Sequence, residues 1–338
     1  MKNIKIGIIG AGRIGKVHAE SIAYKLPQVK IKTIADINVD EAKLVAKQFN
    51  IPKYTIDYKE IINDSEIEAV IICSPTNTHS KIIIDAAKKG KHIFCEKPID
   101  LTIEKISETL KVVEENNVKM MVGFNRRFDP NFLKVKNMVK EGRIGNPNLL
   151  KITSRDPEPP CKDYIKVSGG LFLDMAIHDF DMARYIVDSE VTEVFSMGEV
   201  LIDEGIRDAG DIDTAVTMLK FENGAIGTID NSRKAIYGYD QRIEIFGSKG
   251  MIYINNNKAE NHVYINETGE HSSLPLNFFM DRYTESYFQE MKLFVDALVN
   301  NSEILANGND GLNAVKIALA AKKSLQENRP IKLNSLIN

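Results

Sequence analysis

The hydrophobic and polar positions of the first 123 residues alternate between two patterns. Short apolar, mostly β-branched runs predict strands at residues 4–9, 31–35, 69–73, 91–95 and 118–122. Between them, apolar positions recur with a helical period and predict a helix after residue 15 and others at 39–48, 57–62, 79–89 and 102–116. Because strand and helix alternate, the pattern predicts a parallel, doubly wound sheet with right-handed crossovers. Ligands of such a sheet bind at the carboxyl ends of its strands.

The pattern changes after residue 123, where we place a domain boundary. Helices are predicted at 130–140 and 168–187, with a strand at 149–154 between them. Further strands are predicted at 191–201, 213–221, 225–230, 240–246, 250–255 and 261–266. Short turns at 222–224 and 247–250 fit the hairpins of an antiparallel sheet. Helices at 282–300 and 309–327 complete the predicted elements.

The predicted helix at 168–187 is apolar in almost every direction around its axis. Wound at about 100° per residue, it places Asp174, His178 and Asp181 along one line. Ionisable groups in a buried helix need partners, because burying an unpaired charge is costly. The structural interpretation of this polar stripe is a histidine satisfied within the core. The functional interpretation is a proton-transfer site, which requires a cofactor site elsewhere in the chain, and the candidate residues for that lie in the first half.

Composition and charge narrow the class of protein. The chain has 338 residues, enough for two domains, and a formal net charge of -3 with basic and acidic residues interleaved, which argues against nucleic acid as a partner. Cys73, Cys95 and Cys161 show no CxxC spacing and fit reduced thiols of a cytoplasmic protein. No apolar segment is long enough to span a membrane. We expect no metal site and expect His262 and His271 to be exposed.

A glycine-rich turn follows the first predicted strand and precedes a helix. Its sequence is Gly10-Ala-Gly-Arg-Ile-Gly15, and glycines at this spacing allow a tight turn and a close approach to a pyrophosphate at a helix N-terminus. Asp36 ends the second strand, where its carboxylate can accept hydrogen bonds from ribose hydroxyls and repel a 2′-phosphate. Ile37 follows instead of a basic residue, so the sequence favours NAD over NADP. The predicted cofactor-binding residues here are Gly10, Ala11, Gly12, Arg13, Ile14, Gly15 and Asp36.

Two further strand ends carry polar groups. Ser74-Pro-Thr-Asn-Thr-His79 follows the strand at 69–73, and Glu96-Lys97-Pro98 follows the strand at 91–95. We expect the loop with Lys97 to border the nicotinamide, because ligands bind at these strand ends. We expect His79 to begin the next helix, with a structural or cofactor-lining role. The predicted cofactor-lining residues of these two segments are Ser74, Thr76, Asn77, His79, Glu96 and Lys97.

The glycine turn, the two polar strand ends and the distant pair Asp174-x-x-x-His178 together resemble the glucose-fructose oxidoreductase/inositol dehydrogenase/rhizopine catabolism (Gfo/Idh/MocA) family. Three stretches are most similar to its inositol 2-dehydrogenase branch: 154–157, 168–184 and 237–242. The resemblance implies an α/β plus α+β protein. An NAD-binding Rossmann domain at 1–123 would precede a substrate-binding and oligomerisation domain at 124–338, whose large, mostly antiparallel sheet would assemble homotetramers. It also implies a cis bond between Lys97 and Pro98.

The resemblance also implies the chemistry. Lys97, Asp174 and His178 would be catalytic in the NAD-dependent oxidation of a secondary hydroxyl of a cyclic polyol, with myo-inositol giving scyllo-inosose as the leading reaction. His178 would be the base, because an imidazole titrates near neutral pH, and Asp174 or Asp181 would hold its tautomer. Lys97 would hydrogen-bond the reacting oxygen and stabilise its developing charge.

For the remaining substrate contacts, the sequence offers two neighbouring candidates at each position. Arg126 and Arg127 follow the last strand at 118–122, and side-chain alternation should send one of them towards the ligand. The alternative interpretation is that this arginine forms an ion pair between the two domains. Tyr237 is the family-implied phenol, with Tyr239 as its rival. The alternatives to myo-inositol oxidation are of two kinds. One is the oxidation of another inositol isomer or of an aldose, and the other is a non-catalytic role as a dinucleotide-binding sensor.

Overall fold

The computed structural model describes residues 4–336, which form two compact units. Unit 1 consists of the chain up to Phe128 together with Glu285–Val315, and unit 2 consists of Asp129–Thr284 together with the chain from Lys316 onward. The division therefore differs from a single cut near residue 123. A segment from the last third of the chain returns to unit 1, which the order of elements along the sequence does not reveal.

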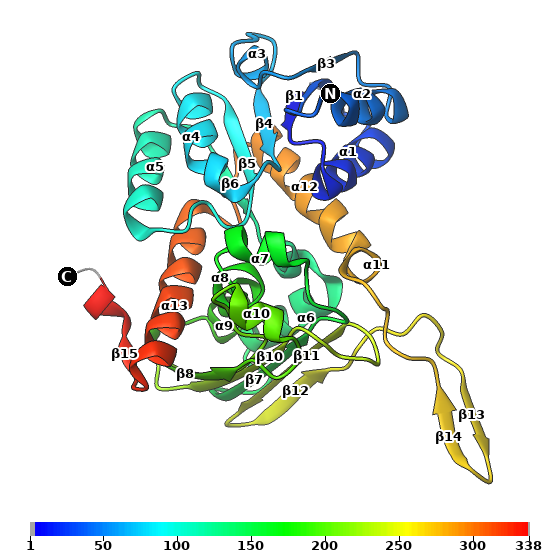
Figure 1. Cartoon of the computed structure of the whole chain (residues 1–338), viewed down its shortest axis with the longest axis vertical. Helices are drawn as coiled ribbons and strands as arrows, with labels where there is room; N and C mark the ends of the chain where they lie inside the picture. Colours follow the sequence, from blue (N-terminus) through cyan, green and yellow to red (C-terminus); the bar gives the residue numbers. More distant parts are fainter. Residues whose placement is uncertain (1–3, 337–338) are drawn as a thin grey trace. The chain divides into compact units, whose positions relative to one another are not determined.

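Unit 1 is built on a six-stranded parallel sheet (Figure 1). Its strand order is β3-β2-β1-β4-β5-β6, and the order reverses between β1 and β4, which confirms the doubly wound sheet. The strand β3 was not predicted, because it has only three residues and two of them are exposed. The strands are β1 (Ile4–Ile9), β2 (Val29–Ala35), β3 (Lys53–Thr55), β4 (Ala69–Ile72), β5 (His92–Glu96) and β6 (Met120–Gly123).

The helices of unit 1 follow the predicted alternation. Helix α2 has the predicted bounds. The expectation that His79 begins the next helix was wrong, because α4 begins at Thr76, so that Thr76 and Asn77 lie in its first turn. The helices are α1 (Arg13–Lys25), α2 (Val39–Gln48), α3 (Lys59–Ile62), α4 (Thr76–Ala87), α5 (Ile103–Glu115), the 3₁₀-helix η1 (Asn125–Phe128), nearly all of α12 (Thr284–Val299) and the first part of α13 (Gly308–Glu327).

Unit 2 contains a seven-stranded sheet in the order β12-β11-β7-β10-β9-β8-β15. The pair β7 and β10 is parallel and the other neighbours are antiparallel, which confirms the large, mostly antiparallel sheet. Its strands are β7 (Pro147–Arg155), β8 (Val191–Glu199), β9 (Thr214–Phe221), β10 (Ile226–Ser232), β11 (Asp240–Gly247), β12 (Gly250–Ile254) and β15 (Ile331–Lys332). A separate hairpin consists of β13 (Val263–Asn266) and β14 (Gly269–Ser272), and His262 and His271 are exposed, as expected.

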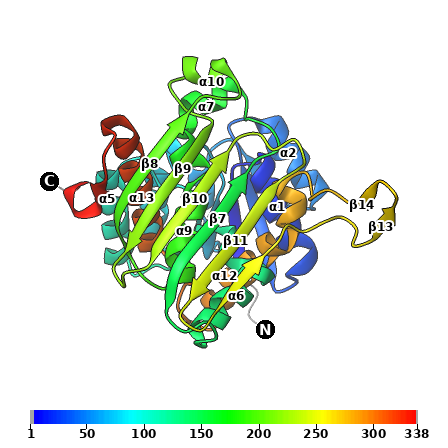
Figure 2. The same ribbon diagram turned by 90° about the horizontal axis from the view of Figure 1, so that it is seen from below.

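Helices cover one face of the seven-stranded sheet. Helix α9 packs on β7 and α6 packs on α9, over buried side chains such as Leu150 and Ile152. Figure 2 looks onto the opposite face, with no helix of the described chain in front of the central strands. The helices of unit 2 are α6 (Pro130–Lys140), α7 (Lys162–Ser168), α8 (Leu171–Asp174), α9 (Ile177–Val187), α10 (Glu204–Asp208), α11 (Phe279–Arg282) and the 3₁₀-helix η2 (Leu333–Leu336), with the end of α13.

The expectation of one continuous helix at 168–187 was wrong. Gly169 and Gly170 have positive φ angles of 90° and 83° and separate α7 from α8. Between α8 and α9, the Ala176 N–H donates to the carbonyl of Leu171, five residues back, at 2.9 Å. This wider turn breaks the regular winding, so Asp174 lies at the end of α8 and His178 at the start of α9.

No helix within residues 4–336 is long and apolar enough to cross a membrane.

Candidate cofactor and active site

The glycine turn of unit 1 has the space that a dinucleotide needs. Gly10 has φ +106°, and a Cβ added there would lie 2.5 Å from the backbone of Cys73. A Cβ on Gly15 would lie 2.0 Å from the Gly10 oxygen, so both positions require glycine. A Cβ on Gly12 would meet nothing within 4 Å, and Gly12 is the N-cap of α1 without a side-chain cap. Open space at a helix N-terminus fits a pyrophosphate, because the first N–H groups of a helix lack internal partners.

Asp36 is held against this turn. Its Oδ2 accepts a hydrogen bond from the Ala11 N–H at 2.7 Å, and its Oδ1 accepts one from the Asn38 N–H at 2.8 Å. The side chain of Ile37 beside it is 92% exposed. The carboxylate is therefore fixed next to the glycine turn with no basic residue adjacent to it in sequence. This arrangement suits a ribose with free hydroxyls better than one with a 2′-phosphate.

His79 connects the two polar strand ends. Its Nδ1 lies 2.8 Å from the Pro98 carbonyl and its Nε2 lies 2.7 Å from the Ser74 carbonyl, and the side chain is buried. Burial lowers the pKa of His79, and the two carbonyls oppose that effect. His79 therefore ties the loop after β4 to the loop after β5, which gives it a structural role within the predicted site.

Glu96 at the end of β5 and Lys97 in the loop that follows lie in half-buried positions. The Lys97–Pro98 peptide bond is cis, which confirms the expectation. Glu96 pairs in register with Gly123 on β6, and a Cβ on Gly123 would lie 2.8 Å from the Glu96 Oε2. Gly123 thus leaves room for the Glu96 carboxylate, whose Oε1 lies 2.7 Å from the His18 Nε2.

In unit 2, Asp174 is the centre of a polar network. Its Oδ1 accepts from the Tyr164 hydroxyl at 2.8 Å and its Oδ2 accepts from the Arg233 Nη1 at 3.2 Å. Arg233 is only 1% exposed and its Nη2 lies 3.6 Å from Asp211, which itself accepts from the Leu171 N–H at 3.0 Å. Sequence reasoning missed Tyr164, Arg233 and Asp211. The available signal was an arginine directly after a strand, since a buried arginine needs acidic partners.

Burial separates the acids around His178. Asp174 and His178 are half-buried, whereas Asp181 and Asp179 are completely buried. The Oδ2 of Asp179 accepts from the Asn231 amide at 2.9 Å. Within the polar stripe, Asp174 and His178 therefore keep some exposed surface and Asp181 does not, and which acid tunes His178 stays a prediction.

The two arginines after β6 are both buried, and the alternation expected for them was wrong, because residues 125–128 form the 3₁₀-helix η1 and not a strand. Arg127 donates to the Leu305 carbonyl at 2.8 Å and pairs with Asp310 at 2.9 Å. Both partners belong to unit 1, so this ion pair lies within one unit and does not join two. Arg126 remains a predicted substrate contact.

The two candidate tyrosines differ in exposure. Tyr239 is 6% exposed and meets the Tyr283 ring edge-to-face at 6.0 Å, so it is part of the core. Tyr237 is half-buried, donates its hydroxyl to Asp240 at 2.6 Å and accepts from Arg155 at 3.1 Å. Burial and the neighbouring Asp240 raise the pKa of Tyr237. Of the two, Tyr237 is the more exposed, and its contact with a substrate stays a prediction.

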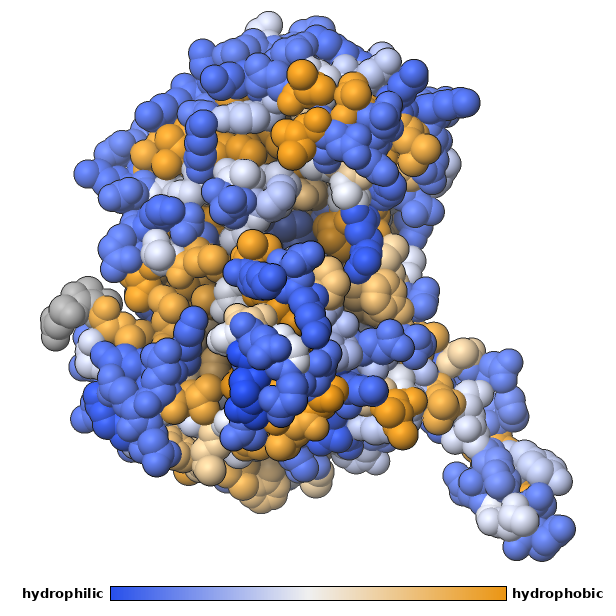
Figure 3. All heavy atoms as spheres, viewed as in Figure 1, coloured by the Kyte–Doolittle hydropathy of each residue, from blue (hydrophilic) through white to orange (hydrophobic). Residues whose placement is uncertain are grey.

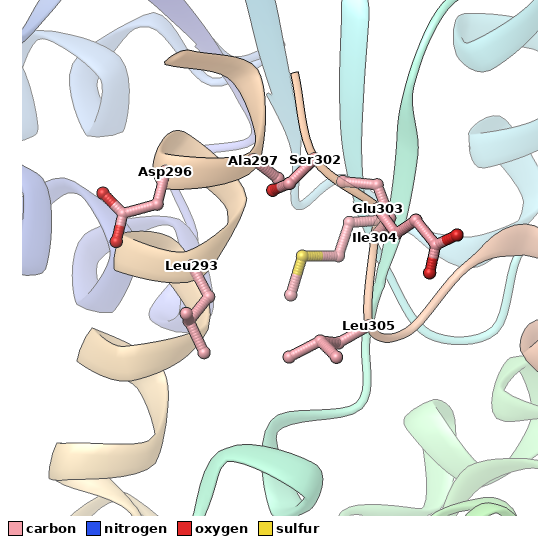
Figure 4. A pocket seen from close by; sticks show the side chains of 8 residues that line it. Leu293, Asp296, Ala297, Ser302, Glu303, Ile304 and Leu305 are labelled. Carbon is pink, nitrogen blue, oxygen red and sulfur yellow. The ribbon is translucent and has the colours of Figure 1, made fainter. Parts of the chain in front are cut away.

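A surface pocket of about 460 Å³ lies elsewhere in unit 1 (Figure 4). Met121, Leu293 and Leu305 give it an apolar lining, and the carboxylates of Asp296 and Glu303 lie at opposite edges. None of the predicted cofactor or catalytic residues lines this pocket. It is therefore separate from the predicted site.

The six-stranded parallel sheet and the glycine turn define the class of this protein as a dinucleotide-binding protein with a doubly wound fold. Residues 4–124 match the model of the oxidoreductase family with an NAD-binding Rossmann fold, and residues 132–253 match the GFO/IDH/MocA C-terminal domain. The chain belongs to the Gfo/Idh/MocA family and is an NAD-dependent dehydrogenase acting on a CH–OH group.

Similar proteins extend over the whole chain. The myo-inositol 2-dehydrogenase of Thermotoga maritima is 48% identical over 99% of this chain and 100% of its own length. The inositol 2-dehydrogenase of Rhizobium meliloti is 45% identical over 98% of this chain and 99% of its own. Among solved structures, scyllo-inositol dehydrogenase from Lactobacillus casei with bound NAD(H) and scyllo-inositol has a TM-score of 0.92 at 32% identity, covering 98% of this chain and 100% of that one.

Proposed function

We propose that this chain oxidises one secondary hydroxyl of an inositol, with myo-inositol giving scyllo-inosose as the leading reaction. The observation that carries the proposal is the similarity, over nearly the full length of both chains, to proteins named myo-inositol and inositol 2-dehydrogenase. The accessible Asp174 and His178 support it, because a dehydrogenase needs a base beside the cofactor. The similarity to a scyllo-inositol dehydrogenase makes scyllo-inositol the second candidate substrate.

Bound NAD supplies the hydride acceptor for the hydrogen on the reacting carbon. His178 takes the proton of the hydroxyl group, so that the C–H electron pair leaves as hydride while the O–H bond breaks. Asp174 stabilises the charged imidazole, and its own position is fixed by Tyr164 and Arg233. Lys97 donates a hydrogen bond to the substrate oxygen as negative charge develops on it.

A substrate panel tests this proposal. Purified protein is mixed with NAD and with each inositol isomer or a common aldose, and the absorbance of NADH is followed. We expect the highest kcat/KM for myo-inositol, and preference for scyllo-inositol would select the second candidate. An aldose as the preferred substrate would contradict the inositol assignment. No reduction of NAD with any of these compounds would favour a dinucleotide-binding sensor.

We also propose that the open face of the seven-stranded sheet is covered by a second copy of this chain in a homotetramer. Large apolar side chains on this face are about half exposed, and Figure 3 shows apolar atoms along the edge of unit 2 where the sheet lies. Several large exposed apolar side chains gathered on one face of a sheet are typical of an interface. The side chains are Leu149, Met197, Val216, Met218, Phe246, Met251 and Tyr253.

Light scattering after gel filtration tests the assembly. We expect a tetramer for the wild type and smaller species for Met218→Glu, which places a charge at the centre of the face. Asn223→Glu, in the exposed turn after β9, is the matched control and should leave the assembly unchanged. A monomeric wild-type protein would refute the proposal. A cytoplasmic location is likewise a prediction, to be checked by cell fractionation.

A further inference from the structure

Three ionisable groups meet inside unit 1 from distant parts of the sequence. His18 lies on α1, Glu96 at the end of β5 and Glu290 on α12, and one atom of each lies within 4.8 Å of the others. His18 and Glu290 have no exposed surface, and the Glu96 side chain is 14% exposed. Both carboxylate oxygens of Glu290 are buried without a hydrogen-bond partner among the described residues.

The surroundings of the cluster are apolar and crowded. The His18 ring meets the Phe94 ring edge-to-face at 5.0 Å and the Tyr287 ring at 5.8 Å. On the other side of Glu96, Gly123 leaves only enough room for the carboxylate. Glu96 is thus held between the backbone of β6 and the imidazole of His18.

Two negative charges cannot share this space at low cost. Burial raises the pKa of Glu290 well above its ordinary value, and the charge of Glu96 raises it further. The other titratable groups around it are His18 from α1, Tyr287 from its own helix and Cys73 from the end of β4, whose thiol pKa is also raised by burial and by both glutamates. His18 is the one basic group of this set, and it is already hydrogen-bonded to Glu96.

We propose that Glu290 stays protonated in the working enzyme, so that Glu96 is the single anion of the cluster and His18 holds it in position for the cofactor. Glu290 is a positioning residue in this scheme, since it acts through Glu96. The inference rests on the proposed role of Glu96 in cofactor binding. Ionisation of Glu290 at high pH puts a second negative charge beside Glu96, disturbs the hydrogen bond between His18 and Glu96 and weakens cofactor binding.

The test compares the full-length wild type with Glu290→Gln, which has the same shape and cannot ionise. NADH affinity is measured by fluorescence titration between pH 6 and pH 10. We expect the wild-type affinity to fall about tenfold or more on the alkaline side, because like charges this close in a protein interior repel strongly. We expect Glu290→Gln to stay within about twofold of its affinity at neutral pH, because it lacks the carboxyl group whose ionisation weakens cofactor binding in this scheme.

Infrared difference spectra supply the second readout. The wild type should show the carbonyl band of a protonated, buried carboxyl group at neutral pH, and Glu290→Gln should lack it. If Glu290→Gln does not fold, the wild type alone still tests the proposal, because the band should be present at neutral pH and disappear as Glu290 ionises at high pH. Absence of the band at pH 7, or the same alkaline loss of affinity in both proteins, would overturn the proposal.

Metal analysis tests whether the cluster of His18, Glu96 and Glu290 holds a metal ion in place of the proton on Glu290. A stoichiometric divalent metal in the wild type that is lost in Glu290→Gln would show that the cluster holds an ion, and the proposal would be wrong. Because all these readouts use NADH binding or spectroscopy, they are independent of the substrate. Failure to oxidise inositols with intact NADH binding would contradict the proposed function and leave this cluster unaffected.

Discussion

Asp36 offers a quantitative test of cofactor selection. Replacing Asp36 by Ala and Ile37 by Arg removes the carboxylate beside the glycine turn and adds a cation at a position that is 92% exposed. Hydrogen bonds to a charged group contribute about 1.5–3 kcal/mol each, so losing one contact to the ribose should lower kcat/KM for NAD about 10- to 150-fold. For NADP, removing the repulsion between the Asp36 carboxylate and the 2′-phosphate at a partly solvated site should make the free energy of binding more favourable by roughly 1–2 kcal/mol.

The two effects add, because they act on different cofactors. The ratio of kcat/KM for NAD to that for NADP should therefore fall by about 10²-fold or more in the double variant. The assay measures kcat/KM for both cofactors at a saturating concentration of the polyol. An unchanged ratio would refute the assignment of Asp36 to the adenosine ribose.

The variant Asp36→Asn separates the effect of the Asp36 charge on cofactor choice from its effect on the stability of the glycine turn. Asp36 also accepts hydrogen bonds from the Ala11 and Asn38 N–H groups, so its removal loosens the turn. Asp36→Asn keeps an oxygen that can accept from Ala11 but has no charge. It should raise the relative use of NADP with a smaller loss of thermal stability than Asp36→Ala. Equal loss of stability in both variants would show that the charge itself anchors the turn.

Three further predictions concern the proposed chemistry and the buried acid. Lys97→Met should lower kcat at least about 10²-fold if Lys97 acts in the transition state, and a change in KM alone would make it a binding residue. Asp174→Asn should shift the pH dependence of kcat/KM, which reports His178, more than Asp181→Asn does, and the reverse order would make Asp181 the tuning acid. Glu290 has a raised pKa in the folded protein, so its stabilising contribution is complete below the pKa of an unfolded glutamate and is lost as pH rises towards the folded value. Glu290→Gln should gain stability over the wild type by up to about 1.4 kcal/mol per pH unit between pH 5 and pH 7 in urea unfolding, and a constant difference would contradict this.

The elements that the sequence predicted well are those whose apolar period continues for several residues. Helices α2 and α6 have the predicted bounds because a full amphipathic face repeats in each. Strand β3 and strand β15 have three and two residues, too few for any period to be recognised. The return of α12 to unit 1 could not be predicted either, because periodicity shows that a helix has an apolar face but not which surface it covers.

The broken helix at 168–187 shows where the geometry expected from the sequence was wrong, while the roles predicted for its polar residues stay predictions. The 100° winding made Asp174 and Asp181 equal partners for His178, and the bond from Ala176 to Leu171 removes the basis of that equality. Burial then distinguishes them, since Asp181 is enclosed and Asp174 is not.

The polar networks around the predicted residues are the part of the site that a single sequence conceals. Asp174 depends on Arg233, 59 positions away, and Glu96 depends on His18, 78 positions away. No local pattern links such residues, because each pair is created by strand order and helix packing. The predicted residues are those that motifs place at strand ends, and the residues that hold them in position became visible only in the folded chain. For that reason the His18, Glu96 and Glu290 cluster is a sharper test of the structure than the motif residues, which the sequence alone already singled out.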